Sequence, residues 1–443
     1  MRRPFKLLLW AMLGPLAVLL LLALAWVACN GYWADADPQP VPPELKPQAV
    51  TLAPADNAFF DGQGLRAPEG ESPNAWGQRA WLGESDKDAR LLAMPTGEDW
   101  TCNATKTDCV ARWRADAAML KAQMATARVF GERCQALAGR HGYQEPVPVL
   151  RPRLPGGDAY IVRSLPQFLP ASSCMAWLQI EAVIASDATQ AALGWQRADA
   201  LLRLMASGAQ TLLGQAVTWS WATRHQLLLA QWAARQPAGF ALPAAWLAPM
   251  PARILQPRVW IASEAQFQRE TIADLKAHRE QLFGTDPTPL QSWAGRLSLG
   301  YLPERTAQAF NAAWLADTRA FGELQGPALV QRARSVSEPD RPLLSYLRWR
   351  NTVGHVLQEV ARPQFKSYPL RQADLVLSQA ALEMSQQLND VPAAERAAWW
   401  AGRPMEPGIR ERLSLEGDAL VVRTWRAEAE PAQVPLRFPL RPA

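Results

Sequence analysis

The sequence predicts a mainly α-helical protein with a single N-terminal transmembrane helix, a Pro-rich linker, an irregular α-helical array and a small C-terminal β-hairpin or sheet. Three observations give this prediction. Residues 7–28 contain no charged side chain. Apolar residues then recur every three to four positions in one segment after another, which is the period of an amphipathic helix. After residue 410 they alternate with polar residues, as in a half-buried strand.

The N-terminal segment Leu7–Ala28 has the length and composition of a membrane-spanning helix. As a helix it would extend about 33 Å, which is enough to cross a hydrocarbon core of about 30 Å. Arg2, Arg3 and Lys6 precede it. Because cationic residues are in excess on the cytoplasmic side of membrane helices, we expect a cytoplasmic N-terminus. The sequence thus predicts a single-pass protein of the bacterial inner membrane with residues 29–443 in the periplasm.

Three other interpretations of this segment stay open. A cleavable signal peptide would have a shorter apolar run with a small-x-small site close behind it, and the best such site, Ala34-Asp35-Ala36, lies well beyond the run. A lipoprotein would use Cys29, but Trp26 stands where a small aliphatic residue is expected. The Arg2-Arg3 pair is typical of a twin-arginine signal, whereas the run is richer in leucine than that route favours. An uncleaved anchor fits best.

Composition divides the chain into four predicted parts. Residues 1–28 form a cytoplasmic tip and the anchor. The Pro-rich stretch 29–56 predicts an extended polyproline II spacer that lifts the body off the bilayer. Residues 57–405 form the helical body, which begins with a Gly- and Pro-rich segment, 57–77, interpreted as an ordered irregular loop. Residues 406–443 form a small β element packed on the body.

Helices are predicted wherever the apolar period is sustained. They cover residues 110–137, 172–185, 188–213, 216–235, 260–282, 303–323, 341–361 and 370–389. No fixed repeat length joins them, which favours an irregular array over tetratricopeptide repeats. At the C-terminus, residues 413–422 predict a hairpin around Glu416-Gly417-Asp418, and the prolines in 434–440 permit only an edge strand there.

The cysteines of the body predict disulfides. Cys29 belongs to the edge of the anchor, which leaves Cys102, Cys109, Cys134 and Cys174, an even number in an oxidising compartment. Cys102 and Cys109 bracket a short polar loop, and Cys134 and Cys174 belong to neighbouring predicted helices. The favoured pairing is therefore 102–109 with 134–174, although the other two connectivities stay open. Zinc binding is the rival interpretation, but ligand pairs spaced as CxxC or HxxxH are absent.

No catalytic, cofactor-binding or metal-binding motif is recognisable. The 4 His residues are scattered, and GxSxG, SxxK and phosphate-binding Gly-rich motifs are absent. The net charge of +5 is not gathered into a basic stripe, so we expect no nucleic-acid partner. His225 shares a helix face with apolar residues and is interpreted as a core histidine bonded to the backbone. Glu181, Asp199, Glu264 and Glu270 are interpreted as solvated surface acids.

Four blocks of the sequence together resemble a group of uncharacterised proteobacterial membrane-anchored envelope proteins. The blocks are NAFFDGQGLRAPEGESPNAWG (57–77), WTCNATKTDC with the helix after it (100–137), LPERTAQAFNAAW (302–314) and NTVGHVLQEVARPQFKSYPLRQADL (351–375). The resemblance covers about half of the body and is specific as a set. It implies the same layout of anchor, Pro-rich spacer and helical body with a Cys pair, and it carries no established activity. His355 stands where the group is expected to have a basic residue.

Three hypotheses of function follow, the third being a carrier for an apolar ligand, which would need a continuous cavity lined by Trp and Leu. The favoured one is a non-enzymatic module that interacts with an envelope protein or with peptidoglycan. The alternative is an envelope hydrolase that cleaves peptidoglycan or another glycan through carboxylates that the sequence does not identify. Two acids about 5–10 Å apart in one cleft would support the hydrolase.

Overall fold

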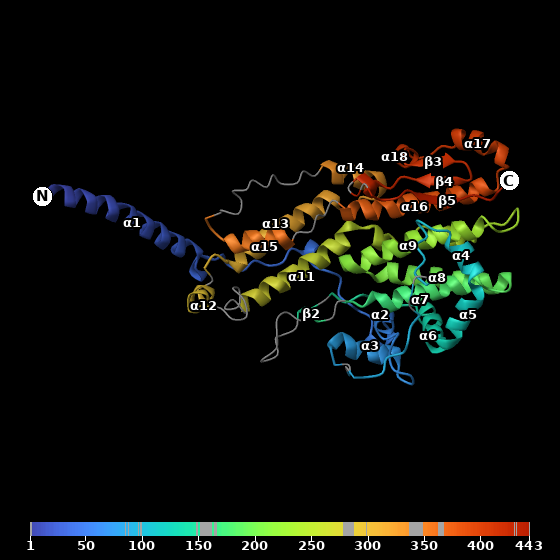
Figure 1. The fold of residues 1–443 in the computed structure, drawn as a ribbon, viewed down its shortest axis with the longest axis horizontal. Helices are drawn as coiled ribbons and strands as arrows, with labels where there is room; N and C mark the ends of the chain where they lie inside the picture. The colour runs from blue at the N-terminus through green and yellow to red at the C-terminus, as the bar shows by residue number, and fades with distance from the viewer. Residues whose placement is uncertain are drawn as a thin grey trace.

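The computed structural model describes residues 2–84, 86, 88–95, 97, 100–147, 149–150, 162–163, 166–277, 288–297, 299–335, 349–361, 367–428, 430 and 432–442. Helices dominate it, with 65% of the chain helical. A long N-terminal helix projects from an elongated helical body that carries a small sheet (Figure 1). The predicted fold class is confirmed.

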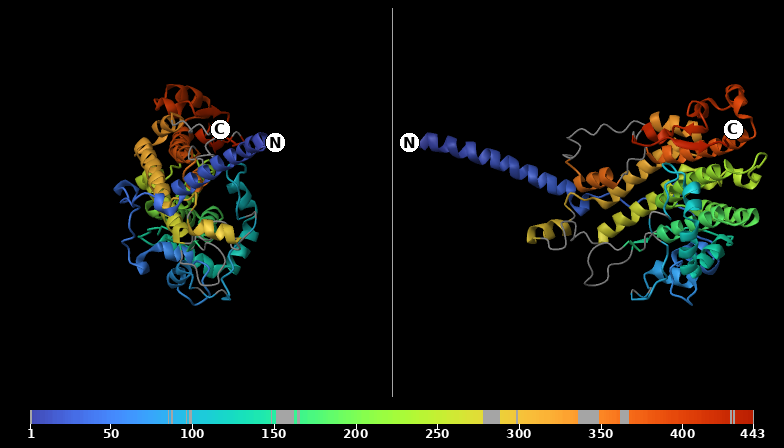
Figure 2. Two further views of the ribbon diagram at one scale, coloured as in Figure 1. Left: turned by 90° about the vertical axis from the view of Figure 1, so that its left-hand side faces the viewer. Right: turned by 45° about the vertical axis from the view of Figure 1, so that its right-hand side comes forward.

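The N-terminal helix α1 spans Arg2–Asn30. Its stretch Leu13–Asn30 is long and apolar enough to cross a membrane, and almost all of that stretch is exposed. The right-hand view of Figure 2 shows α1 extending away from the body, which it meets at its C-terminal end. Length and composition of this kind serve a membrane anchor or a signal sequence equally well.

The Pro-rich segment after α1 lies on the body and is not the free spacer that the sequence suggested. It contains three short 3₁₀ turns, η1 (Tyr32–Ala34), η2 (Pro43–Leu45) and η3 (Pro54–Asp56). Leu45 is fully buried, and its carbonyl accepts a hydrogen bond of 3.0 Å from Arg269. Proline composition predicts an extended backbone, but it does not reveal that a neighbouring helix binds the carbonyl groups.

Two short helices form in the segment that was expected to be an irregular loop. Helix α2 (Ala58–Gln63) begins after Asn57, whose side chain accepts from the Phe59 N–H, and α3 is Pro73–Leu82. The two helices touch at Gly64 and Gly77. A Cβ on Gly64 would lie 1.8 Å from the Pro73 carbonyl oxygen, so a side chain there would separate them.

The predicted helix 110–137 is divided into three. These are α4 (Cys109–Ala115), α5 (Ala117–Thr126) and α6 (Arg128–Ala138). The breaks fall at Asp116 and Ala127, where the backbone leaves the helical region for ψ values of 11° and 30°. The apolar period runs through both breaks, which is why the sequence predicted one helix.

A bundle of long helices forms the centre of the body. Helices α7 (Phe168–Val183), α8 (Ala188–Gly208) and α9 (Leu212–Ala233) follow one another, and α16 (Ser367–Asn389) packs on α9. The predicted helices for these segments agree to within a few residues. Asp187 caps α8 by accepting from the Gln190 N–H at 2.8 Å.

The remaining helices cover this bundle, and α11 packs on α13. They are α10 (Ala244–Leu247), α11 (Pro257–Ala277), α12 (Pro289–Arg296), α13 (Pro303–Phe321), α14 (Gly326–Ser335), α15 (Thr352–Ala361), α17 (Arg396–Gly402) and α18 (Pro407–Arg410), with 3₁₀ turns η4 (Ala252–Leu255) and η7 (Ala393–Glu395). The first part of the predicted helix 341–361 lies outside the described residues, and its second part is α15.

Two antiparallel sheets complete the fold. The smaller pairs β1 (Val149–Leu150) with β2 (Val162–Arg163). The C-terminal sheet has the order β3-β4-β5, with β3 Leu413–Glu416, β4 Ala419–Val422 and β5 Leu436–Pro439. Gly417 makes the predicted hairpin turn at φ 61°, and β5 is the predicted edge strand. The sheet packs on α16 and α9, and η8 (Trp425–Glu428) follows β4.

Candidate functional site

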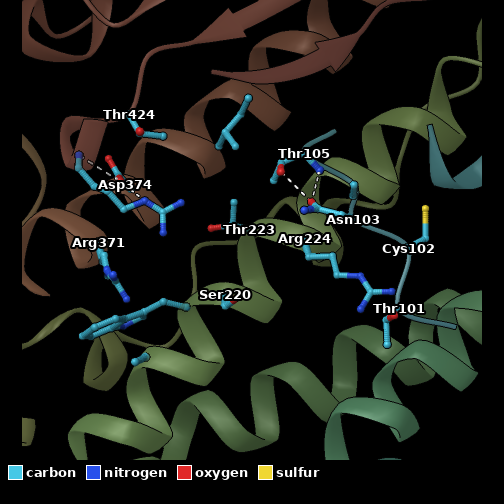
Figure 3. A pocket seen from close by; sticks show the side chains of 15 residues that line it. Thr101, Cys102, Asn103, Thr105, Ser220, Thr223, Arg224, Arg371, Asp374 and Thr424 are labelled. Carbon is cyan, nitrogen blue, oxygen red and sulfur yellow. Dashed lines mark hydrogen bonds and ion pairs between the residues drawn. The ribbon is translucent and has the colours of Figure 1, made fainter. Parts of the chain in front are cut away.

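A polar cleft of about 370 Å³ opens where four separate segments of the chain meet. They are the loop before α4, helix α9, the start of α16, and the C-terminal segment around η8 and β5 (Figure 3). We call it the arginine cleft. It is lined by Thr101, Cys102, Asn103, Ala104, Thr105, Ala216, Trp219, Ser220, Thr223, Arg224, Arg371, Asp374, Thr424, Arg426 and Leu436.

A disulfide between Cys102 and Cys109 closes the loop that forms one wall of the cleft. Within this loop, the Asn103 Oδ1 accepts hydrogen bonds from the backbone N–H and the hydroxyl of Thr105, at 3.1 and 2.7 Å. The Gln231 side chain of α9 accepts from the Cys109 N–H at 3.0 Å and donates to the Ala104 carbonyl at 3.4 Å. The loop is therefore held both by its cross-link and by α9.

Helix α9 supplies Ser220, Thr223 and Arg224 from one face, because residues three and four apart lie side by side on a helix. The Arg224 guanidinium donates to the Trp100 carbonyl at 3.4 Å and lies over the Trp113 ring, 5.8 Å from its centre. Within the part of the chain that the structure describes, Arg224 forms no ion pair. Burial lowers its pKa to about 10, so the side chain remains a cation at neutral pH.

The facing wall carries two more arginines and one carboxylate. Arg371 is bonded to Glu430 at 2.7 Å, and the Arg426 Nε lies 3.8 Å from the Asp374 carboxylate. Asp374 accepts hydrogen bonds from the Trp425 and Arg426 N–H groups, at 2.7 and 3.4 Å. Burial nevertheless raises the pKa of Asp374 to about 7. In Figure 3, Arg371 and Arg224 lie on opposite sides of Ser220 and Thr223.

Several hydrogen-bond donors of the cleft have no partner. The Nε atoms of Arg224, Arg371 and Arg426 and the Thr424 hydroxyl oxygen are buried and form no hydrogen bond within the described structure. A buried polar group left unsatisfied costs about 1–3 kcal/mol. Glu430 offsets the charge of Arg371 and Asp374 faces Arg426, so Arg224 supplies the unpaired positive charge of the cleft, which is suited to a ligand with anionic acceptor atoms.

The predicted disulfide cysteines pair as the sequence analysis favoured. Cys102 bonds Cys109 at the rim of the cleft, and Cys134 bonds Cys174, which joins α6 to α7 in the core. Cys29 is free and exposed. Among the residues that the structure describes, no three His, Cys, Asp or Glu side chains gather as metal ligands.

Asp199, expected at the surface, is buried. Its carboxylate accepts from Arg203 Nε at 2.8 Å and lies 3.9 Å from the His225 Nε2. Burial raises the pKa of Asp199 and lowers that of His225 to about 3, so the histidine is neutral. His225 is a core histidine as expected, but Gln179 contacts its Nδ1 at 3.3 Å in place of a backbone group.

Two further carboxylates meet at the N-terminus of α9. Glu145 is fully buried and accepts from the Gln210 and Thr211 N–H groups at 2.8 and 3.0 Å. Burial raises its pKa to about 7. The pKa of Glu264 is also raised to about 7, first by burial and further by the charge of Glu145. These acids bind the free N–H groups of a helix end, which is a structural role. Glu264 is thus not the solvated surface acid that the sequence suggested.

The cleft geometry gives the hydrolase alternative no support. Asp374 is the one carboxylate in the lining of the arginine cleft. A second cleft of about 350 Å³, between the linker and α11, contains Glu44, and a third of about 280 Å³, beside α16, contains Glu383. Within these described clefts, no two acids face each other as glycoside hydrolysis requires.

Sequence reasoning missed the three arginines of the cleft. Arg224 belongs to α9, Arg371 to α16 and Arg426 to η8, and no local pattern links these segments. The one available signal is Arg224 itself, a cation placed among the tryptophans and leucines of α9.

Comparison with protein-family models, with curated proteins and with solved structures found no match to this chain.

Proposed function

We propose that this chain is a single-pass protein of the bacterial inner membrane whose periplasmic body is a non-enzymatic binding module. In this proposal, the N-terminus is cytoplasmic, α1 remains as the anchor, and the arginine cleft holds an anionic group of the cell wall. Peptidoglycan is the polymer beside such a body, and the carboxylates of its stem peptides are the class of ligand that we propose.

The observation that carries this proposal is the guanidinium of Arg224. A partly buried cation without a carboxylate partner is unfavourable, because desolvation is not offset by an opposite charge. Arg371, Arg426 and Thr424 line the same cleft, and the Nε atoms of both arginines and the Thr424 hydroxyl form no hydrogen bond within the described structure. An anion bound there would bring a compensating negative charge to Arg224, and guanidinium groups match carboxylates in geometry.

The location is supported by two features. Two disulfides and an apolar N-terminal helix indicate an extracytoplasmic protein. Retention of the anchor is favoured by Asp35, whose carboxylate accepts from the Glu304 and Arg305 N–H groups, both at 3.0 Å. The best signal-peptidase site includes Asp35, so processing there would cut within a segment that belongs to the folded body.

Binding is tested by calorimetry on the full chain in detergent, with a soluble muropeptide and with inorganic phosphate as probes. We expect muropeptide binding that weakens about tenfold or more in Arg224→Gln, because a hydrogen bond to a charged group contributes about 1.5–3 kcal/mol. Arg128→Gln is the matched control, since it also removes one positive charge but from an exposed helix surface. Absence of muropeptide binding, or equal effects of the two variants, would contradict the proposal; binding of phosphate without binding of the muropeptide would show that the cleft holds an anion other than a carboxylate of the wall.

Location is tested by fusing alkaline phosphatase, which folds only in an oxidising compartment, to the C-terminus. We expect an active enzyme in the membrane fraction, and an intact mass of the extracted chain that includes residues 1–30. A soluble, active fusion of lower mass would show that α1 is a cleaved signal. An inactive fusion would show that the body lies in the cytoplasm, contrary to the proposed topology.

A further inference from the structure

Five large apolar side chains are exposed where α1 enters the body. Tyr32 and Trp33 follow α1 directly, Leu290 and Trp293 belong to α12, and Trp349 precedes α15. They are between 49% and 73% exposed. Figures 1 and 2 show α12 beside the end of α1 that meets the body. We call these five residues the base.

Hydrogen bonds hold the three segments of the base against the end of α1. The buried Asn30 side chain donates to the Trp349 carbonyl at 2.7 Å and accepts from the Asn351 N–H at 2.7 Å. The Tyr32 N–H donates to the Leu297 carbonyl at 3.0 Å, which joins η1 to the residue after α12. The base therefore has a fixed position relative to α1.

The composition of the base differs from that of an ordinary protein surface. Four of its five residues are Trp or Tyr, the side chains that gather at the interface between the hydrocarbon and the aqueous layer. Single exposed apolar residues are common and need no partner, but a cluster drawn from three segments indicates a contact surface. Arg296 and Arg350, both exposed, lie in the same segments and supply cations for lipid phosphates.

We propose that the base rests in the interfacial layer of the bilayer that α1 crosses. Its occupant is the lipid surface, because the apolar helix that ends at Asn30 brings that surface close to these five residues. Trp293 and Leu290 then enter the headgroup layer, with Arg296 and Arg350 at the phosphates. This inference shares one condition with the proposed function, namely that α1 stays in the membrane.

Spin labels on the full chain in phosphatidylethanolamine–phosphatidylglycerol vesicles test the contact. In a Cys29→Ser background, one label is placed by Leu290→Cys at the base, one by Leu193→Cys on α8 and one by Leu20→Cys in α1. All three leucines are exposed, so labelling leaves the core intact. The measurement is the accessibility of each label to oxygen, which collects in lipid, relative to a water-soluble nickel complex.

We expect an oxygen-to-nickel ratio at position 290 that is several-fold above that at 193 and approaches that at 20. If position 290 matches 193 while position 20 lies in lipid, the anchor stands and the contact of the base is overturned. If position 20 is also in water, α1 is no anchor and both proposals fail.

A second measurement uses the label at 290 after Trp293→Ser and Trp349→Ser have removed two aromatic contacts. The ratio at 290 should fall toward that at 193, since burying one large apolar side chain contributes about 1.5–3 kcal/mol. Leu213→Ser, an exposed leucine of α9, is the matched control and should leave the ratio unchanged. An equal fall in the control, or no fall in the double variant, would overturn the inference.

Discussion

The arginine cleft and the base expose opposite kinds of atoms. In the cleft, the aromatic residue Trp219 is buried, whereas arginine Nε donors and a hydroxyl form no hydrogen bond. At the base, the polar groups of Asn30 and Asp35 are all engaged by neighbouring backbone, whereas large aromatic side chains face outward. A lining of unsatisfied polar groups favours contact with a charged ligand, and an exposed apolar surface favours contact with lipid. The kind of atom left unsatisfied therefore distinguishes the two partners that we propose.

Among substitutions compared at one pH, the largest expected loss of stability comes from removing the hydrogen bonds of Asn30 beneath the base. Asn30→Leu would leave the buried Asn351 N–H and the part-buried Trp349 carbonyl without these partners, and a buried group left unsatisfied costs about 1–3 kcal/mol. We expect the free energy of unfolding, measured by urea titration, to fall by about 3 kcal/mol. Asn103→Ala, in the exposed cleft loop, is the control and should cost less than about 1 kcal/mol. Similar losses of unfolding free energy in the two variants would show that the hydrogen bonds of Asn30 stabilise the protein no more than those of a surface turn.

Removing the disulfide of the cleft wall should weaken binding without affecting the base. The double variant Cys102→Ser, Cys109→Ser opens a loop with a sequence separation of 7, for which chain entropy gives a loss of about 2 kcal/mol. We expect muropeptide affinity to fall while the label at position 290 remains in lipid. Loss of membrane contact in this variant would mean that the two regions are coupled and that the comparison fails.

The Asp374 carboxyl should make the cleft sensitive to pH. Its pKa rises from an ordinary 3.8 to about 7, so the folded chain binds its proton more tightly than the unfolded chain does. Its contribution to stability is thus complete at low pH and is lost as pH rises toward 7, at about 1.4 kcal/mol for each pKa unit. Ionised Asp374 also brings a negative charge beside Arg426, which opposes binding of an anion.

Asp374→Asn tests this sensitivity, because asparagine keeps an acceptor for the Trp425 N–H but cannot ionise. We expect the fall in unfolding free energy between pH 5 and pH 8 to be smaller in the variant, and its muropeptide affinity to be flat through pH 7. The carboxyls of Glu145 and Glu264 titrate in the same direction in both proteins and form a common background. Identical pH profiles would exclude Asp374 as the source.

The smallest expected effect separates stability from binding within the cleft. Thr424→Val removes a buried hydroxyl that has no partner, so the unfolding free energy should rise by up to about 1 kcal/mol. Ligand affinity should fall at the same time, because one donor to the anion is lost. A variant that loses both stability and affinity would show that this hydroxyl has a structural role.

The helices and the C-terminal sheet could be predicted because their cause is local. An apolar period marks α8 and α9 directly, and Gly417 marks its turn. Helix breaks at Asp116 and Ala127 escaped notice because the period continues through them. The sequence also did not predict the burial of Asp199, because a charged side chain is expected at the surface unless a partner such as Arg203 pairs with it.

The cleft could not be predicted because its parts come together only in the folded chain. Arg224 and Arg426 are about 200 positions apart, and their relation depends on how α16 and the C-terminal sheet pack on α9. The base is similar: Trp33, Trp293 and Trp349 are unremarkable singly in a chain with 20 Trp residues. In both regions, composition supplied the residue types and tertiary packing supplied the site.

The packing of residues 29–56 on the body limits the movement of the body relative to α1. If residues 29–56 formed a flexible chain, the body would lie at an average distance of about 30 Å from the end of α1 and could move freely within that range. Leu45 in the core and Asp35 on α13 remove that freedom, so any tilt of α1 turns the whole body with it. With α1 as the proposed anchor, the cleft would keep a fixed height above the bilayer, and the local concentration of wall polymer at that height would govern its occupancy.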